Sequence, residues 1–251
     1  MKSEGHVLVI GAASMDYKGR PDSRLIHRGS TPGRIRSSVG GVGRNIAENL
    51  ARLEVETKLL TAVGDDGPGE QLIGQATASG VDTSEVLVEP GRRTGAYLAL
   101  LDENGALEAA IDDMNVLEAL TPRYLYDRRR LIRDARMVVV DANLMPEALE
   151  TVIRLCEQYN VPLGADPTSP ILAHRLCPHL AKLYMTTPNE GEATTLCDMA
   201  FEPRKRDKAL AAAQRLVGLG VGTAIITLAE FGAVYANAET KGHVPAIPTE
   251  I

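Results

Sequence analysis

The chain has 251 residues, of which 44% are hydrophobic, so it is long enough to bury a substantial core. Its formal net charge of −6 disfavours binding to nucleic acid or to a membrane surface. Cys156, Cys177 and Cys197 are odd in number and form no Cys-x-x-Cys pair, which argues against a zinc site and favours unpaired thiols. With no recognisable signal peptide or transmembrane stretch, these features predict a cytoplasmic protein.

Short apolar runs alternate with helical stretches along the chain. The apolar runs predict buried strands at residues 7–10, 58–63, 137–140, 162–165, 183–186 and 224–227. The helical stretches fall at about 43–53, 67–79, 122–134, 146–158 and 206–218. This alternation predicts an α/β fold with a mostly parallel sheet covered on both faces. In such sheets ligands bind beyond the carboxyl ends of the strands, where Asp16, Asn143, Asp166 and Asn189 fall.

Residues 17–38 and 94–113 break this alternation. The first segment is polar and punctuated by Gly and Pro, and the second contains Asn104-Gly105 between two strand-like runs, which is a hairpin signal. We expect the two segments to form one small secondary sheet, inserted in a single domain of residues 1–251. This sheet is interpreted as a lid over the site, as an oligomer interface, or as both.

The segment 39–51 is the strongest functional signal. Its glycines let the backbone approach a ligand closely. Asn45, in the first turn of the following helix, adds a donor and an acceptor, which suits a polyhydroxylated ring better than a phosphate. The helix is predicted to bury one face and to expose Arg44 on the other, the buried face being formed by Ile46, Ala47, Leu50 and Leu53. Neither G-x-x-x-x-G-K-[ST] nor G-x-G-x-x-G is present. The alternative is a loop whose glycines only relieve backbone strain.

Five blocks in order along the chain resemble the PfkB (ribokinase-like) carbohydrate and nucleoside kinases. They are Asp16 after the first strand, Gly40-Gly41-Val42-Gly43-Arg44-Asn45, Val63-Gly64-Asp65-Asp66-Gly67-Pro68-Gly69, Thr187-Pro188-Asn189-Glu190-Gly191-Glu192-Ala193 and Thr227-Leu228-Ala229-Glu230-Phe231-Gly232-Ala233. Pro32-Gly33-Arg34-Ile35 and Ala110-Ile111-Asp112-Asp113-Met114-Asn115 resemble the members that act on pseudouridine. The resemblance implies a ribokinase-like three-layer sandwich with a small β lid. It also implies transfer of the ATP γ-phosphoryl group to the 5′-hydroxyl of a nucleoside or sugar.

The resemblance and the strand-end positions together predict the site residues. Substrate contacts are expected from Asp16, Gly40, Gly41, Val42, Asn45, Thr94, Asp113 and Asn143. The resemblance further implies that ATP is bordered by Asn189, Thr227 and Gly232, and that Glu192 helps to organise Mg²⁺ through water. Two other interpretations stay open: Asp16 could form a local turn, and Asn189 with Glu192 could form a capping box, which is compatible with a metal role.

The chain also departs from the family pattern. Ala229 stands where the family usually has Gly. The final G-A-G-D motif, which supplies the catalytic Asp, is expected beyond Ile251, so no catalytic residue is assigned and this chain is expected to be catalytically incomplete. The alternatives are a ribose- or fructose-type kinase of the same family and a non-catalytic nucleoside-binding protein. A nicotinamide dehydrogenase lacks its fingerprint here. The expected protein partner is a second copy, bound through the lid.

Overall fold

The computed structural model describes residues 5–199 and 205–247. The chain divides into two compact units. The larger unit combines the N-terminal residues up to Leu8 with the residues from Thr121 onward, and the smaller unit is Val9–Leu120. The single domain expected from the sequence therefore stays a prediction. Among the described residues, no helix has the length and apolar character needed to cross a lipid bilayer.

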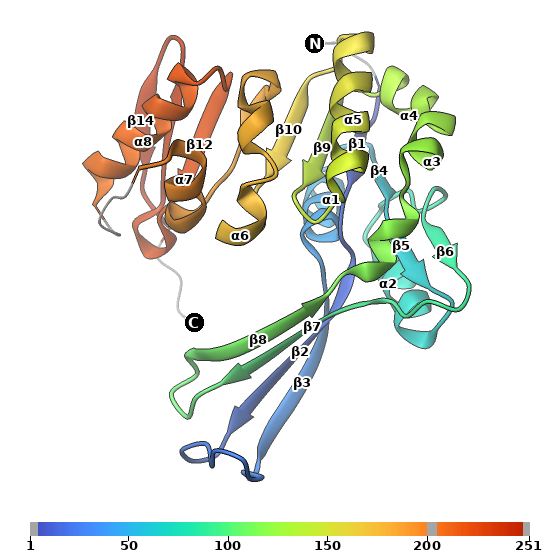
Figure 1. The fold of residues 1–251 in the computed structure, drawn as a ribbon, viewed down its shortest axis with the longest axis vertical. Helices are drawn as coiled ribbons and strands as arrows, with labels where there is room; N and C mark the ends of the chain where they lie inside the picture. The colour runs from blue at the N-terminus through green and yellow to red at the C-terminus, as the bar shows by residue number, and fades with distance from the viewer. Residues whose placement is uncertain (1–4, 200–204, 248–251) are drawn as a thin grey trace. The chain divides into compact units, whose positions relative to one another are not determined.

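The larger unit contains a sheet flanked by helices (Figure 1). Its strands are β9 (Met137–Asp141), β10 (Leu163–Asp166), β11 (Met185–Thr186), β12 (Thr223–Thr227), β13 (Ala233–Asn237) and β14 (Lys241–Val244). Its helices are α3 (Pro122–Asp127), α4 (Arg129–Asp134), α5 (Pro146–Tyr159), α6 (Pro170–Ala173), α7 (Glu190–Cys197) and α8 (Arg206–Gly218), with 3-10 turns at Cys177–Lys182 and Ala229–Phe231.

The strands of the larger unit are paired in the order β14-β13-β12-β11-β10-β9. The pairings from β9 to β12 are parallel, and the pairings of β13 with β12 and with β14 are antiparallel. Parallel strands need helical crossovers, and α5 supplies one of them: it begins at Pro146 and ends where Asn160 adopts a left-handed φ of 53°. Helix α8 packs on β12 and β13. The predicted α/β class with a mostly parallel sheet is confirmed.

The smaller unit contains the glycine-rich segment and the two inserted segments. Strand β1 (Val7–Ile10) runs into it from the larger unit, and β4 (Thr57–Leu60) follows β1 in the strand order. The remaining elements are β2 (Ser14–Pro21), β3 (Gly33–Gly40), α1 (Val42–Arg52), β5 (Ala62–Gly64), α2 (Gly67–Ala78), β6 (Leu87–Glu89), β7 (Gly95–Leu101), β8 (Leu107–Asp113) and a 3-10 turn at Asn115–Ala119.

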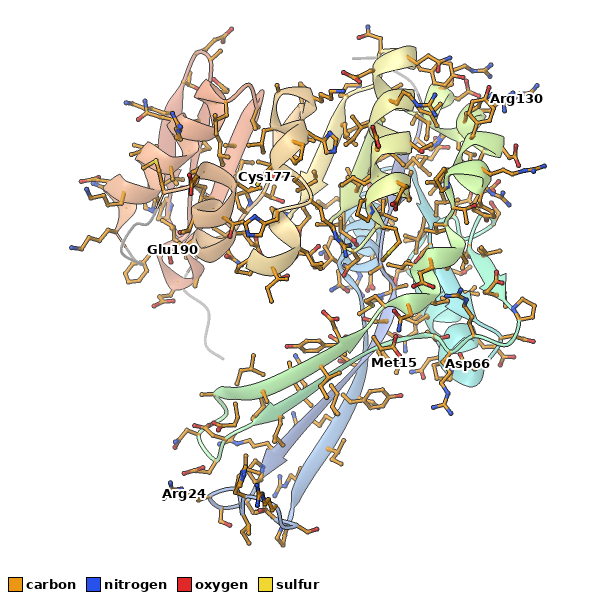
Figure 2. All side chains as sticks on the ribbon, viewed as in Figure 1. Met15, Arg24, Asp66, Arg130, Cys177 and Glu190 are labelled. Atoms are coloured by element: carbon orange, nitrogen blue, oxygen red, sulfur yellow. The ribbon has the colours of Figure 1, made fainter. Side chains whose placement is uncertain are left out.

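Strands β2, β3, β7 and β8 form a separate four-stranded sheet in the order β3-β2-β7-β8, which we call the lid sheet (Figure 1). The predicted hairpin turn lies between β7 and β8, where Gly105 has φ 90°. Met15 lies at the base of this sheet and Arg24 at its far end (Figure 2). At the base, Met15 packs against Ala13, Val63 and Leu72, which anchors the sheet to the rest of the smaller unit.

The two faces of the lid sheet differ in polarity, because residues two apart on a strand share a face. One face carries the aligned row Ser38, Asp16, Tyr97 and Asp112, and we call it the polar face. The opposite face carries the row Ser37, Tyr17, Leu98 and Ile111, and we call it the apolar face. Its Ile35, Leu98, Leu100 and Ile111 side chains are all exposed.

Three local expectations from the sequence are wrong. The run 58–63 is split into β4 and β5, and the helix expected over 122–134 is interrupted at Arg128. Arg44 in α1 is buried with 5% of its surface exposed, whereas Leu53, which directly follows α1, is 74% exposed. Periodicity assigned these two residues to the wrong faces because it does not detect a guanidinium group that is satisfied by neighbouring oxygens.

Candidate functional site

The carboxylate of Asp16 lies directly over the α-carbon of Gly40. A Cβ atom on Gly40 would stand 2.2 Å from Asp16 Oδ1 and 2.5 Å from Oδ2, so only glycine leaves room for this carboxylate. Ser14 fixes one oxygen, because its hydroxyl donates to Asp16 Oδ1 at 3.2 Å. Asp16 is half-buried on the polar face of the lid sheet, and the second oxygen is available to accept hydroxyl hydrogen bonds.

The start of α1 is pressed against the chain that follows β1. Gly41 precedes the helix with φ 89°, and a Cβ there would meet Ala12 O and Ala13 Cα at 2.5 Å. A Cβ on Gly43 would lie 2.8 Å from the carbonyl carbon of Gly11. These glycines therefore do more than relieve strain, since they let a helix start and a strand end come into backbone contact.

Arg44 organises the first turn of α1. Its Nε donates to the Gly40 carbonyl at 3.1 Å, and its guanidinium group forms an ion pair with Glu48. A further guanidinium nitrogen donates to Asn45 Oδ1 at 3.2 Å. Asn45 is exposed and its side-chain carbonyl accepts this bond, so its amide N–H groups remain as donors. Sequence reasoning missed Arg44, although its place between Gly43 and Asn45 was the available signal.

Thr94 belongs to a polar clamp at the base of the lid sheet. Its hydroxyl donates to Asp66 Oδ1 and accepts from Gly64 N at 2.9 Å, while its backbone N–H donates to Asp66 Oδ2 at 2.9 Å. Asp66 also caps α2 by accepting from Gly69 N at 2.9 Å. Although burial alone would raise it, these hydrogen bonds hold the pKa of Asp66 below its ordinary value. Thr94 is buried, with 8% of its surface exposed, and its hydroxyl both donates and accepts within this clamp.

Asp113 lies at the end of β8 and its side chain is exposed. It is the register partner of Ala96 on β7, and its Oδ1 accepts from Asn115 N at 3.2 Å, which starts the following 3-10 turn. Within the smaller unit, the structure thus gathers six predicted substrate residues around the lid base and the α1 start, and places Asp113 at the β8 edge. The six are Asp16, Gly40, Gly41, Val42, Asn45 and Thr94.

In the larger unit, Asn189 and Glu192 form a complete capping box at the start of α7. Asn189 Oδ1 accepts from Glu192 N at 3.0 Å, and Glu192 accepts from the backbone N–H of Asn189 at 2.8 Å and from its Nδ2 at 2.7 Å. Asn189 is bridged to Thr227 at the end of β12, where Thr227 N donates to Pro188 O at 3.0 Å. The capping-box interpretation of this motif is therefore confirmed. Asn189 and Thr227 are adjacent, and both are exposed.

Two carboxylates converge behind this capping box. Burial raises the pKa of Glu192, and the nearby charge of Asp166 raises it further. Burial also raises the pKa of Asp166, although its Oδ1 accepts from Thr168 N at 2.8 Å and its Oδ2 from Thr187 Oγ1 at 3.3 Å. Sequence reasoning noted Asp166 at a strand end but gave it no role, because nothing local indicates its coupling to Glu192.

The loop after β12 contains Gly232 and Ala229, and both have a positive φ. Gly232 has φ 89°, and a Cβ there would lie 2.0 Å from Val244 O, so no other residue fits. Its carbonyl accepts from Leu228 N at 2.8 Å. Ala229, where a glycine was expected by resemblance, adopts φ 49°, a left-handed conformation that costs a non-glycine residue about 1–2 kcal/mol.

Asn143 is buried, with 5% of its surface exposed, after β9 in the larger unit. Its backbone N–H donates to Asp141 Oδ1 at 3.0 Å. Arg175 holds this turn by donating to the carbonyls of Ala142, Asn143 and Leu144 at 2.9, 3.1 and 2.9 Å. Asn143 thus lies in a different unit from the other predicted substrate residues. Arg175 was not found from the sequence, where an isolated Arg carries no signal.

The described residues include no group of three or more His, Cys, Asp or Glu side chains arranged to hold a metal ion directly. The donor set of Asp166 and Glu192 nevertheless fits a hard cation bound through water. Both groups are carboxylates whose charged forms are disfavoured by burial, and a divalent cation prefers oxygen ligands of this kind.

Comparison with known proteins identifies relatives of this chain. The chain is 38% identical to pseudouridine kinase of Escherichia coli over 205 residues, which cover 82% of this chain and 65% of that protein. It is 37% identical to the E. coli sugar kinase YeiI, with 80% of this chain and 57% of that protein covered. Among solved structures, Arabidopsis thaliana ribokinase complexed with ribose and ATP superposes with a TM-score of 0.81 at 21% identity, over 97% of this chain and 78% of that one.

The matched region spans less than two thirds of the length of these E. coli relatives. The fold is ribokinase-like, as expected from the resemblance. The family model described as pfkB family carbohydrate kinase matches residues 4–251. The chain therefore belongs to the pfkB family of carbohydrate kinases.

Proposed function

We propose that this protein transfers the γ-phosphoryl group of ATP to the 5′-hydroxyl of a nucleoside or sugar, with pseudouridine as the substrate and pseudouridine 5′-phosphate as the product. The observation that carries the proposal is the Asp16 carboxylate held over Gly40, together with the exposed Asn45 in the first turn of the helix that follows. The 38% identity to E. coli pseudouridine kinase supports the choice of substrate.

The proposed substrate contacts follow from the charge of Asp16 and from the hydrogen-bond donors of Asn45. A carboxylate that accepts hydroxyl hydrogen bonds contributes about 1.5–3 kcal/mol for each bond, which selects ligands that carry a vicinal diol. The side-chain amide of Asn45 offers further donors to ring oxygens. Thr94 and Asp113 are placed at the lid base and the β8 edge, and Asn143 in the larger unit. Asp113 and Asn143 stay predictions from the sequence, because Asp113 falls by register on the face of Ile111, opposite that of Asp16, and Asn143 belongs to the other unit.

The nucleotide is assigned to the larger unit. Asn189, Thr227 and Gly232 border the proposed ATP position, where Asn189 and Thr227 are bridged and Gly232 shapes the loop. Glu192, with Asp166, would hold Mg²⁺ through water. When bound, Mg²⁺ would neutralise charge on the phosphate oxygens during transfer. The capping box fixes both oxygens of Glu192, which would hold this carboxylate in place for the hydrated ion.

We assign the general base to none of the described residues. By family resemblance it is the Asp of a G-A-G-D motif, expected beyond Ile251, and residues 248–251 themselves lie outside the described residues. Loss of a general base costs about 10²–10⁴ in rate. The residues described above are accordingly proposed to bind the substrate and the nucleotide, not to carry the proton transfer.

We propose that a second copy of the chain binds to the apolar face of the lid sheet. Ile35, Leu98 and Ile111 are 79%, 51% and 69% exposed on this face, and such a contiguous apolar surface is typical of an interface. Leu98→Asp with Ile111→Asp should shift the mass measured by light scattering from dimer to monomer. A wild-type chain that is monomeric at all concentrations contradicts this assignment.

A cytoplasmic location also stays a proposal. It is supported by the three free cysteines, since free thiols are typical of proteins in a reducing compartment.

The experiment that tests the function is a transfer assay with a substrate panel. ATP would be supplied with pseudouridine, uridine, adenosine, ribose or fructose, using this polypeptide and a version extended past residue 251. Preferred turnover of pseudouridine by the extended version supports the proposal. Equal turnover of all five removes the narrow substrate assignment, and preferred turnover of ribose or fructose indicates a sugar kinase. Binding without turnover by both versions indicates a nucleoside-binding protein.

A further inference from the structure

Four cations are gathered on the polar face of the lid sheet, one and two rows beyond Asp16. Lys18 on β2 is the register partner of Arg36 on β3, and Arg20 is the partner of Arg34. Because residues two apart on a strand share a face, these four side chains point to the same side as Asp16. The next residue in the Lys18 row is Ala99 on β7, so this row contains no compensating carboxylate.

These cations line a hollow of about 600 Å³. Its wall also includes Ser38, Leu101 and two acidic residues, Asp22 and Glu103, so four positive charges face two negative ones. Arg20 is oriented by the Glu103 backbone carbonyl, which accepts from Arg20 Nη2 at 2.9 Å. Lys18, Arg34 and Arg36 are exposed, and among the described residues their side chains have no ion-pair or hydrogen-bond partner.

This arrangement works against the stability of the sheet. Like charges directly opposite each other on antiparallel strands destabilise the pairing, and here two such pairs follow each other. The chain as a whole carries a net charge of −6, so the cluster does not reflect a generally basic composition. Local conflicts of this kind are expected where a ligand compensates for them.

We infer that this hollow is a binding site for a phosphate group, formed by Lys18, Arg34 and Arg36 with Arg20 as a pre-oriented fourth donor. A tetrahedral phosphate offers several oxygens, so donors from two strands can share it, and guanidinium groups bind such oxygens through paired hydrogen bonds. A volume of several hundred Å³ accommodates a phosphate ester as well as the free ion.

A nucleic acid fits this feature less well than a single phosphate group does. A polyanion binds along an extended basic stripe, whereas Asp22 and Glu103 border this hollow and the lid hairpin β7–β8 carries only acidic charged residues. The site does not depend on the proposed kinase activity, because its residues are separate from Asp16, Gly40 and Asn45.

The test measures phosphate binding by calorimetry and by thermal unfolding, with the 251-residue chain and ionic strength held constant with NaCl. The probes are inorganic phosphate and ribose 5-phosphate, which distinguish a free ion from an ester. The variant is Arg34→Gln/Arg36→Gln. The matched control is Arg123→Gln/Arg130→Gln, which removes the same charge from exposed residues of the other unit. Lys18→Gln, on the neighbouring strand, repeats the test if the double variant does not fold.

We expect saturable stabilisation of the wild type and of the control by at least one probe, and affinity reduced at least tenfold in Arg34→Gln/Arg36→Gln. Without phosphate, that variant should unfold at the same or a higher temperature, since like-charge repulsion has been removed. Asp16→Asn should retain phosphate binding even if it loses nucleoside binding. The inference is overturned if the double variant binds phosphate as the wild type does, or if NaCl alone reproduces the stabilisation.

Discussion

Replacement of Gly40 by Ala should abolish the Asp16 site without unfolding the protein. The added Cβ would stand 2.2–2.5 Å from three atoms of the Asp16 carboxylate group, far inside ordinary contact distance, so the carboxylate must leave its position. Loss of one hydrogen bond to a charged group costs about 1.5–3 kcal/mol, which corresponds to a roughly 10- to 150-fold weaker affinity for pseudouridine.

A double-mutant cycle measured by calorimetry separates this effect from general damage. If Gly40→Ala acts only by displacing the carboxylate, it should change affinity by less than about 0.5 kcal/mol in an Asp16→Ala background. Gly74→Ala is the matched control, since a Cβ there meets nothing within 4 Å and the residue lies inside α2. Wild-type affinity in Gly40→Ala would refute the steric argument, and so would a full additional loss in the Asp16→Ala background.

Three further changes give independent tests. Ala229→Gly should raise the free energy of unfolding by about 0.5–1 kcal/mol, because φ 49° is strained for Ala, and an unchanged or lower melting temperature would contradict this. Thr94→Val should lower the free energy of unfolding by about 1–3 kcal/mol in urea titrations, since Asp66 and Gly64 each lose a hydrogen-bond partner; a smaller loss would show that the clamp is dispensable. Asp166→Asn should stabilise the protein relative to wild type at pH 8 in metal-free buffer. Because the pKa of Asp166 is raised in the folded state, ionisation of this carboxyl group lowers the free energy of unfolding. The loss is complete above the folded-state pKa and disappears as the pH falls below the unfolded-state pKa. An advantage of Asp166→Asn that is equal at pH 8 and in acid would contradict that cause.

Much of the fold followed from hydrophobic periodicity. Most of the predicted strands and helices exist with ends shifted by one or two residues, because buried runs and Pro at helix starts are local signals. The exceptions have tertiary causes. The run 58–63 divides at Thr61, and β13 and β14 were not predicted as strands. These two strands are short, and their antiparallel pairings, β13 with β12 and β14 with β13, are set by the fold and not by a local run of apolar residues.

Site residues were predictable at positions where only one residue type fits sterically. Gly40, Gly41 and Gly232 are required by contacts with neighbouring atoms that no side chain would permit. Burial of Arg44 and the coupling of Asp166 to Glu192 could not be predicted, because they depend on oxygens brought together from different elements. A sequence shows which residue can carry a charge but not which partner will satisfy it.

The central claim is the proposal that this chain contains the substrate-binding residues of a nucleoside kinase, with the Asp16 carboxylate accepting hydrogen bonds from the sugar hydroxyls. The most direct measurement follows product formation by ³¹P NMR from ATP and pseudouridine, using the version extended past residue 251 and its Asp16→Asn variant. We predict pseudouridine 5′-phosphate from the unmodified protein and at least a tenfold lower kcat/KM in the variant. Absence of a phosphorylated nucleoside, or equal kcat/KM for both proteins, would contradict the account.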